Sequence, residues 1–306
     1  FLTQYTGWRS IFYVAAAFGV VTSILAFTFL GKDNLLAHKA KRPDIKGTLL
    51  YMAGLVFMVY GSSTIPEISG WLMIFTGALA LVMFWIIESR SALPVFNTRL
   101  FTENRLFAYS NMAALINYSA TFAIVFLLSL FLQKIRGLSP LDAGTILIAQ
   151  PAVMAIFSPV AGRLSDRIDP RYLATAGMSM CSVGLIAFSF LSATTPLVVI
   201  IGILIWVGLG FAFFSSPNMN TIMSSVDKTY LGLASGTAAT MRVVGQITSM
   251  TIATLFFAGM FGTQTIELVS NDLFMNAVKW GFLSFALISL AGIYFSYKRG
   301  SKPVSE

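Results

Sequence analysis

The chain has 306 residues, of which 57% are hydrophobic and only 10% are charged, and its formal net charge is +8. This composition excludes a soluble globular domain, in which about a quarter of the residues are charged. The single Cys excludes a disulfide framework and a cysteine-rich metal site, and with the single His it leaves no nucleophile and base pair. No catalytic residue, metal or cofactor is therefore expected.

Nine apolar stretches run through the chain, and each approaches or exceeds the roughly 20 residues that a helix needs to cross a hydrocarbon core about 30 Å thick. They predict an all-α, polytopic transmembrane bundle, because only helices or closed barrels satisfy their own backbone in lipid. The expected spans, in chain order, are Ile11–Leu30, Thr48–Ile65, Trp71–Ile87, Leu106–Gln133, Leu141–Ala161, Tyr172–Leu191, Leu197–Ser216, Leu231–Met260 and Phe274–Tyr297.

The basic residues fall on alternate loops. Fifteen Lys and Arg lie after odd-numbered spans or on the tail, three lie on the opposite side, and Arg242 and Lys279 lie inside spans. The positive-inside rule predicts that the larger set, and with it the C-terminus, faces the cytoplasm. The net charge thus follows from topology in the plasma membrane, with lipids as neighbours, and implies no nucleic-acid partner.

The same orientation places Phe1 outside the membrane, although neither a start Met nor a cleavable signal precedes the first span. An odd number of earlier spans would account for this. We therefore expect the chain to be the C-terminal part of a longer protein, which supplies the N-terminal spans.

Small residues and prolines interrupt the fifth and seventh spans at Pro151, Pro159, Gly162, Gly202, Gly208 and Gly210. Such residues let helices approach closely in lipid. They also mark the broken helices of transport pathways. We expect close packing to be their main role.

The loop after the fifth span, GRLSDRIDPR, holds an acid between two arginines. The arginines can meet phosphates or helix carbonyls, and Asp166 can sit at a helix N-terminus, where the helix dipole favours an anion. The loop resembles the G-x-L-x-D-R-x-G-R-K signature of the major facilitator superfamily, found between the second and third helices of each six-helix half. The matching residues are Gly162, Leu164, Asp166, Arg167 and Arg171, whereas Asp169 and Pro170 depart from the signature. The resemblance implies that Gly162, Asp166, Arg167 and Arg171 form a conformational latch.

Three further stretches resemble one subfamily, the EmrB/QacA type of fourteen-span proton-coupled drug antiporters. They are WRSIF at 8–12, LQKIRGLSPLDAG at 132–144, and PNMNTIMSSV at 217–226 with GLASGTAATMRVVGQ after it. In that subfamily the first opens a helix, the second is an external turn, and the third is a cytoplasmic turn before a helix. Ala15 and Ala17 depart from the Asn and Pro common in the first of these motifs.

The resemblance implies a major facilitator fold and a division of the chain into five parts. Residues 1–30 would be the last helix of the N-terminal bundle, 31–47 a basic cytoplasmic loop, and 48–105 an extra helix pair with a linker. Residues 106–297 would be the C-terminal six-helix bundle, and 298–306 a cytoplasmic tail.

Ionisable groups deep in lipid cost several kcal/mol and are functional candidates. Arg242 lies about eleven residues into the eighth span and shares a helix face with Ser235, Gln246 and Ser249. This polar stripe indicates either a substrate cavity or helix packing, in which Arg242 would bond backbone carbonyls or snorkel to the surface. Weaker candidates for the cavity, or for polar contacts between helices, are Asn111, Tyr118, Thr121 and Gln150.

No carboxylate lies in the middle of a span, so any proton-coupling carboxylate would belong to the N-terminal spans. The resemblance implies a secondary transporter that exports small amphipathic or cationic compounds in exchange for protons. A carrier of another solute is the alternative. Three other classes are disfavoured by features that this sequence does not show. A membrane enzyme would need polar clusters within the spans, a channel would need a selectivity filter, and a sensor would need a soluble output domain.

Overall fold

The computed structural model describes residues 6–29, 45–65, 67–90, 98–262, 266 and 268–300. The chain forms two compact units, Phe1–Pro43 and Asp44–Glu306. The secondary structure of the described ranges consists of helices and contains no strand, which confirms the all-α class. Eight helical segments there are long and apolar enough to cross a membrane, namely Arg9–Phe29, Ile68–Ser89, Arg105–Lys134, Pro140–Ser165, Pro170–Ser189, Leu197–Ser224, Lys228–Phe261 and Asn271–Lys298.

The first unit contains α2, Arg9–Phe29, in which no side chain is buried. Such a helix satisfies its backbone internally and leaves its apolar side chains for lipid or for other membrane helices. The basic loop expected at 31–47 lies outside the described residues, except for 45–47 at the start of α3. The tail beyond residue 300 lies outside them as well.

The second unit begins with a helical hairpin of α3, Ile45–Thr64, and α4, Ile68–Arg90, followed by the short α5, Thr98–Glu103. The expected span at 48–65 is therefore helical, although α3 is not among the eight apolar segments. The hairpin contacts α12 through α3, where the Tyr51 hydroxyl donates to Thr240 Oγ1 at 2.7 Å.

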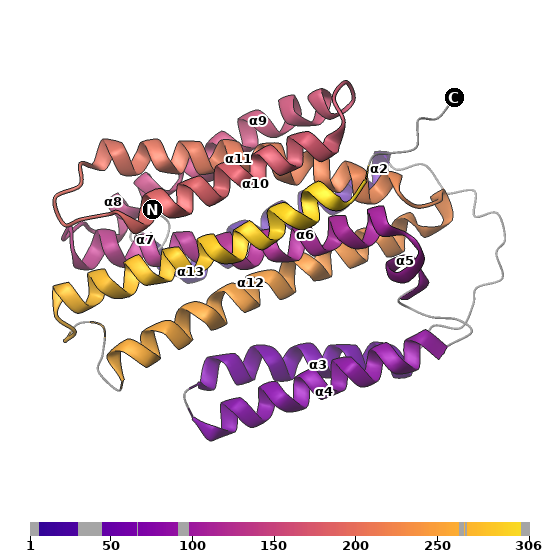
Figure 1. Ribbon diagram of the computed structural model, residues 1–306, viewed down its shortest axis with the longest axis horizontal. Coiled ribbons are helices and arrows are strands. Elements are labelled where there is room, and N and C mark those ends of the chain that lie inside the picture. Colours follow the sequence, from indigo (N-terminus) through magenta and orange to yellow (C-terminus); the bar gives the residue numbers. More distant parts are fainter. Residues whose placement is uncertain are drawn as a thin grey trace. The chain divides into compact units, whose positions relative to one another are not determined.

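Six spans follow in the second unit (Figure 1). The α6 helix packs against α11, α12 and α13, α10 packs against α11 and α13, and α9 packs against α11. Buried Phe, Leu, Ile and Ala side chains fill the spaces between these helices. The elements are α6 Arg105–Thr121, α7 Ala123–Lys134, α8 Pro140–Leu147, α9 Ala149–Ser165, α10 Pro170–Ser189, α11 Leu197–Ser224, the 3₁₀ turn η1 Lys228–Tyr230, α12 Leu231–Phe261 and α13 Asn271–Lys298.

Polar caps fix where several of these helices begin. The side chains of Asn104, Ser139, Asp169 and Ser270 accept backbone N–H groups at the starts of α6, α8, α10 and α13. The expectation that Asp166 lies at a helix N-terminus is wrong, because Asp166 caps the C-terminus of α9. Asp169 takes that place instead, with Pro170 at the first helical position, where a missing N–H costs nothing.

Two expected spans each contain one residue at which the helical hydrogen-bond pattern is interrupted while the backbone angles stay helical. The fourth span breaks at Phe122 between α6 and α7, where the Ala123 N–H donates to Ser249 Oγ of α12 at 3.0 Å. The fifth breaks at Ile148 between α8 and α9, three residues before Pro151, which has no N–H to bond Leu147. A span in lipid tolerates such a break where other groups replace the lost backbone bond.

The small residues of the seventh span mostly serve close packing, as expected. A Cβ added to Gly208 would lie 2.6 Å from the Gln150 carbonyl oxygen, and one added to Gly210 would lie 2.8 Å from that of Gly177. Only glycine permits these approaches of α11 to α9 and α10. No atom lies within 4 Å of a Cβ at Gly202, so that glycine makes no such approach.

The α11 helix continues eight residues past its expected end at Ser216. Pro217 lies inside α11, and the stretch expected to form a cytoplasmic turn is helical up to Ser224. The hydroxyl of Thr221 donates to the Pro217 carbonyl oxygen at 2.9 Å within this last part of the helix. Asn218 therefore lies within a helix, where its side chain is buried, and not in a loop.

The charge pattern and the exposed loops together predict the orientation of the chain. In a Cys181→Ala background, Thr194→Cys and Asp227→Cys should be labelled by an impermeant maleimide from opposite sides of the membrane, since both positions are exposed and lie at opposite ends of α11. The cytoplasmic side should label Asp227→Cys. Labelling of both positions from one side would contradict the topology.

Candidate functional site

A cavity of about 230 Å³ lies between α6, α11 and α12. Gly245 permits the close approach of α12 to α6 beside it, since a Cβ there would lie 2.6 Å from the Leu115 carbonyl oxygen. The cavity wall is formed by Ala114, Tyr118, Phe214, Ser215, Asn218, Met219, Ile222, Ser235, Ala238, Ala239 and Arg242. It combines apolar side chains with a few polar groups, as sites for small organic molecules do.

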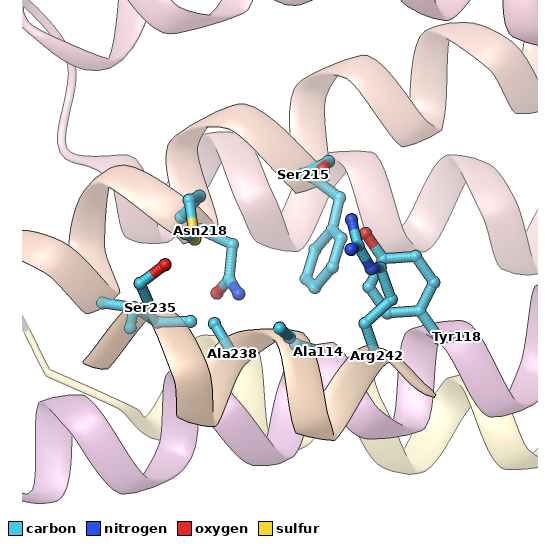
Figure 2. Close-up of a pocket in the computed structure, with 11 residues that line it drawn as sticks. Ala114, Tyr118, Ser215, Asn218, Ser235, Ala238 and Arg242 are labelled. Atoms are coloured by element: carbon cyan, nitrogen blue, oxygen red, sulfur yellow. The ribbon is translucent and has the colours of Figure 1, made fainter. Parts of the chain in front are cut away.

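Arg242 is the one charged side chain in the wall of this cavity. Its guanidinium extends from α12 alongside the ring of Tyr118 and towards Ser215 of α11 (Figure 2). Ser235 lies on the same face of α12, two turns closer to the start of the helix. Arg242 is exposed and lines this cavity, and its role there stays a prediction.

The polar stripe of α12 divides between three environments. Ser235 and Arg242 line the cavity, whereas Gln246 lines a separate groove of about 420 Å³ with Ser62 and Ser63 of α3. Ser249 is fully buried and bonds the backbone at the break between α6 and α7. Gln246 and Ser249 therefore lie outside the cavity, because Gln246 faces α3 and Ser249 faces the junction of α6 and α7.

Of the weaker candidates, only Tyr118 lines the cavity. Asn111 and Thr121 are buried and donate to carbonyl oxygens of their own helix, those of Phe107 at 2.9 Å and Asn117 at 2.6 Å. Gln150 is buried at the break between α8 and α9, and its Oε1 atom has no hydrogen-bond partner. The structure does not bring these three side chains to the cavity, because each points between packed helices.

The residues of the predicted latch lie at one end of α9 and α10. Gly162 and Asp166 line an open cavity of about 700 Å³ with Asn220 of α11. Arg167 is exposed, whereas the guanidinium of Arg171 lies 4.2 Å from the ring centre of Tyr297 on α13. In the structure, Gly162 and Asp166 thus face the open cavity, whereas Arg171 stacks on Tyr297 of α13. The latch role itself stays a prediction.

Sequence reasoning missed two polar residues of this region. Asn218 lines the cavity and is 3% exposed, and Arg299, which follows the last residue of α13, is 1% exposed. The resemblance of PNMNTIMSSV to a cytoplasmic turn predicts a loop at Asn218, and the charge pattern places Arg299 among the cations of the cytoplasmic tail. Neither position carries a local signal of burial.

The comparison with known families decides the assignment. The sequence profile of the Major Facilitator Superfamily matches residues 1–250 and 112–304 of the chain. The chain belongs to the Major Facilitator Superfamily. The resemblance stated from GRLSDRIDPR is thereby confirmed at the level of the superfamily.

Curated relatives include one protein named for riboflavin transport and two named for drug resistance. The chain is 29% identical to the riboflavin transporter RibZ of Clostridioides difficile over 85% of this chain and 56% of the relative. It is 29% identical to the multidrug resistance protein Stp of Mycobacterium tuberculosis over 80% of this chain and 46% of the relative. It is 33% identical to the methylenomycin A resistance protein of Bacillus subtilis over 64% of this chain and 42% of the relative. The chain spans about half the length of these relatives.

A solved structure shares the fold. The inward-facing, occupied form of a bacterial homolog to the human lysosomal transporter Spinster matches with a TM-score of 0.52 at 16% identity. The match covers 83% of this chain and 64% of that one. At this identity the likeness concerns the arrangement of helices alone.

Proposed function

We propose that the chain is part of a fourteen-span, proton-coupled secondary transporter that exports small amphipathic compounds by alternating access. The observation that carries the proposal is the cavity between α6, α11 and α12, in which Arg242 is exposed among apolar and hydroxyl-bearing side chains. Relatives named for drug resistance support an export function. The EmrB/QacA-like motifs support the fourteen-span subfamily, and the remaining spans would belong to the same protein.

The charge of the cavity bears on the kind of solute. Arg242 repels a cationic compound unless a carboxylate outside this chain pairs with it, because like charges in a low-dielectric site are unfavourable. A neutral or anionic amphipathic solute needs no such partner. Cationic cargo therefore requires a carboxylate from the N-terminal spans, and the same carboxylate would serve to couple protons.

A second candidate is a carrier of a metabolite. The relative named as a riboflavin transporter favours it, and riboflavin is a neutral, planar and partly polar molecule. An apolar wall with one guanidinium and several hydroxyls suits such a molecule as well as a drug. Transport of riboflavin and of the cationic dye ethidium by the same vesicles discriminates between the two candidates.

The substitution Arg242→Met tests the proposed site in the full-length protein. Transport should fall about tenfold, because a charge-assisted contact with the solute or with a partner carboxylate is lost. Thermal stability in detergent should hardly change, because Arg242 is exposed and fills no packed space. Initial rates in inverted vesicles and a thermal unfolding curve measure both effects.

Arg242→Lys is the matched control and should retain a larger part of the activity, because it keeps the charge but loses the planar donors. If Arg242→Met melts the protein while its folded fraction transports normally, Arg242 has a packing role instead.

We also propose that Asp166 and Arg167 act as a latch for one access state. Asp166→Asn should then reduce transport about tenfold without loss of folded protein, because a contact worth about 1 to 3 kcal/mol shifts a two-state equilibrium by that much. Asp227→Asn, an exposed acid in the next loop on that side, should have no effect. Wild-type transport by Asp166→Asn would reduce the motif to a determinant of topology.

A further inference from the structure

A buried guanidinium lies where α10, α11 and α13 meet. Arg299 is 1% exposed, and its Nη1 atom donates to Oδ1 of Asn218 at 2.9 Å. Its Nε and Nη2 atoms have no hydrogen-bond partner among the residues that the structure describes. Burial lowers the pKa of Arg299 to about 10, with Asp169 favouring and Arg171 opposing the charged form. The guanidinium thus remains charged at neutral pH.

Asp169 attracts the guanidinium, but the hydrogen bond that Arg299 makes in the described part of the chain is to a neutral amide, so the buried charge is incompletely compensated and calls for a reason beyond stability. The contact that Arg299 makes supplies one. Asn218 is the only hydrogen-bond partner of Arg299 in the described part of the chain, and it is also a wall residue of the Arg242 cavity.

The carboxamide of Asn218 is fixed at both of its ends. Oδ1 accepts from Arg299, and Nδ2 donates to the Ser110 carbonyl oxygen of α6 at 3.1 Å. These two bonds determine which end of the amide faces which helix. Figure 2 shows the carboxamide extending from α11 between Ser235 and Ala114, at the end of the cavity away from Arg242.

We propose that Arg299 is a positioning residue that orients Asn218 in the cavity wall and thereby sets the affinity for the transported solute. With Oδ1 held by Arg299 and one Nδ2 proton on Ser110, the second Nδ2 proton remains available to an acceptor on the solute. Without Arg299 the amide can rotate or flip, and a rigid donor is lost. The proposal rests on the proposed transport function.

A double-mutant cycle tests whether Arg299 acts through Asn218. In the full-length protein, Arg299→Met and Asn218→Ala should each raise the KM for riboflavin or ethidium about tenfold, because each removes the same oriented donor. The double variant should be no worse than either single variant, since the effects of residues that act as a unit do not add. Arg299→Lys should recover part of the affinity by donating one bond to Oδ1.

Ser296→Ala is the matched control for a purely structural role. It removes another buried polar contact between α13 and α10 close to Arg299, the 3.0 Å bond between Ser296 and Thr175 hydroxyls. It should leave KM unchanged even if it lowers the melting temperature. A rise of KM in Ser296→Ala equal to that in Arg299→Met would overturn the positioning role, as would additive effects of Arg299→Met and Asn218→Ala.

The same cycle is measured by thermal unfolding, which needs no transport. Shifts of the melting temperature should be non-additive if the Arg299–Asn218 contact exists, and additive shifts would contradict it. If the wild-type protein transports neither probe, the proposed function fails while the unfolding cycle still decides on the contact. If the wild type transports and Arg299→Met has an unchanged KM, only the positioning role fails.

Discussion

Lipid offers no hydrogen bonds, and this constraint shapes every part of the described structure. Each backbone N–H and C=O within a span must find its partner inside the protein, so the chain crosses the membrane as helices. Where a helix breaks, another side chain must replace the lost bond. Ser249 does so at the break between α6 and α7, where it accepts from the Ala123 N–H. The break and the position of α12 are thereby tied together.

That tie places the polar face of α12. Ser249 of α12 bonds the backbone between α6 and α7, and Gly245 of α12 lets α6 approach closely. These two contacts orient α12 so that Arg242 and Ser235 face the space between α6 and α11. The cavity is thus bounded by helices whose separation is set by backbone contacts and not by the cavity's own side chains. A site built on rigid elements in this way holds its few polar groups in defined positions.

Much of the fold could be predicted from the sequence because span length is a local property. The length of apolar stretches predicts the spans, and GRLSDRIDPR predicts the superfamily. The interruption at Phe122 could not be predicted, because the hydroxyl that accepts the Ala123 N–H there lies 126 residues away in α12. The sequence did not reveal that Asp169, and not Asp166, caps the start of α10. That depends on where α9 ends, which the charge pattern alone does not indicate.

The candidate site was predicted less completely for a related reason. A stripe on a helix indicates which residues share a face, but it does not indicate which neighbour covers each part of that face. Arg242 and Tyr118 line the cavity between α6, α11 and α12, whereas Gln246, on the same stripe, lines a separate groove beside α3. Asn218 was missed because the resemblance of 217–226 to a cytoplasmic turn predicts a loop there, whereas α11 continues through Pro217, and proline is tolerated within membrane helices.

We expect the cavity beside Arg242 to be filled with water and to receive the solute. Cysteine accessibility measures this most directly in the full-length protein with Cys181→Ala. Ala239→Cys, in the cavity wall, should react with a water-soluble methanethiosulfonate, and riboflavin or ethidium should slow the reaction. Leu287→Cys, at an exposed apolar position of α13, should react slowly with or without solute. Equal reactivity at both positions, or no protection of Ala239→Cys by any transported solute, would contradict the account.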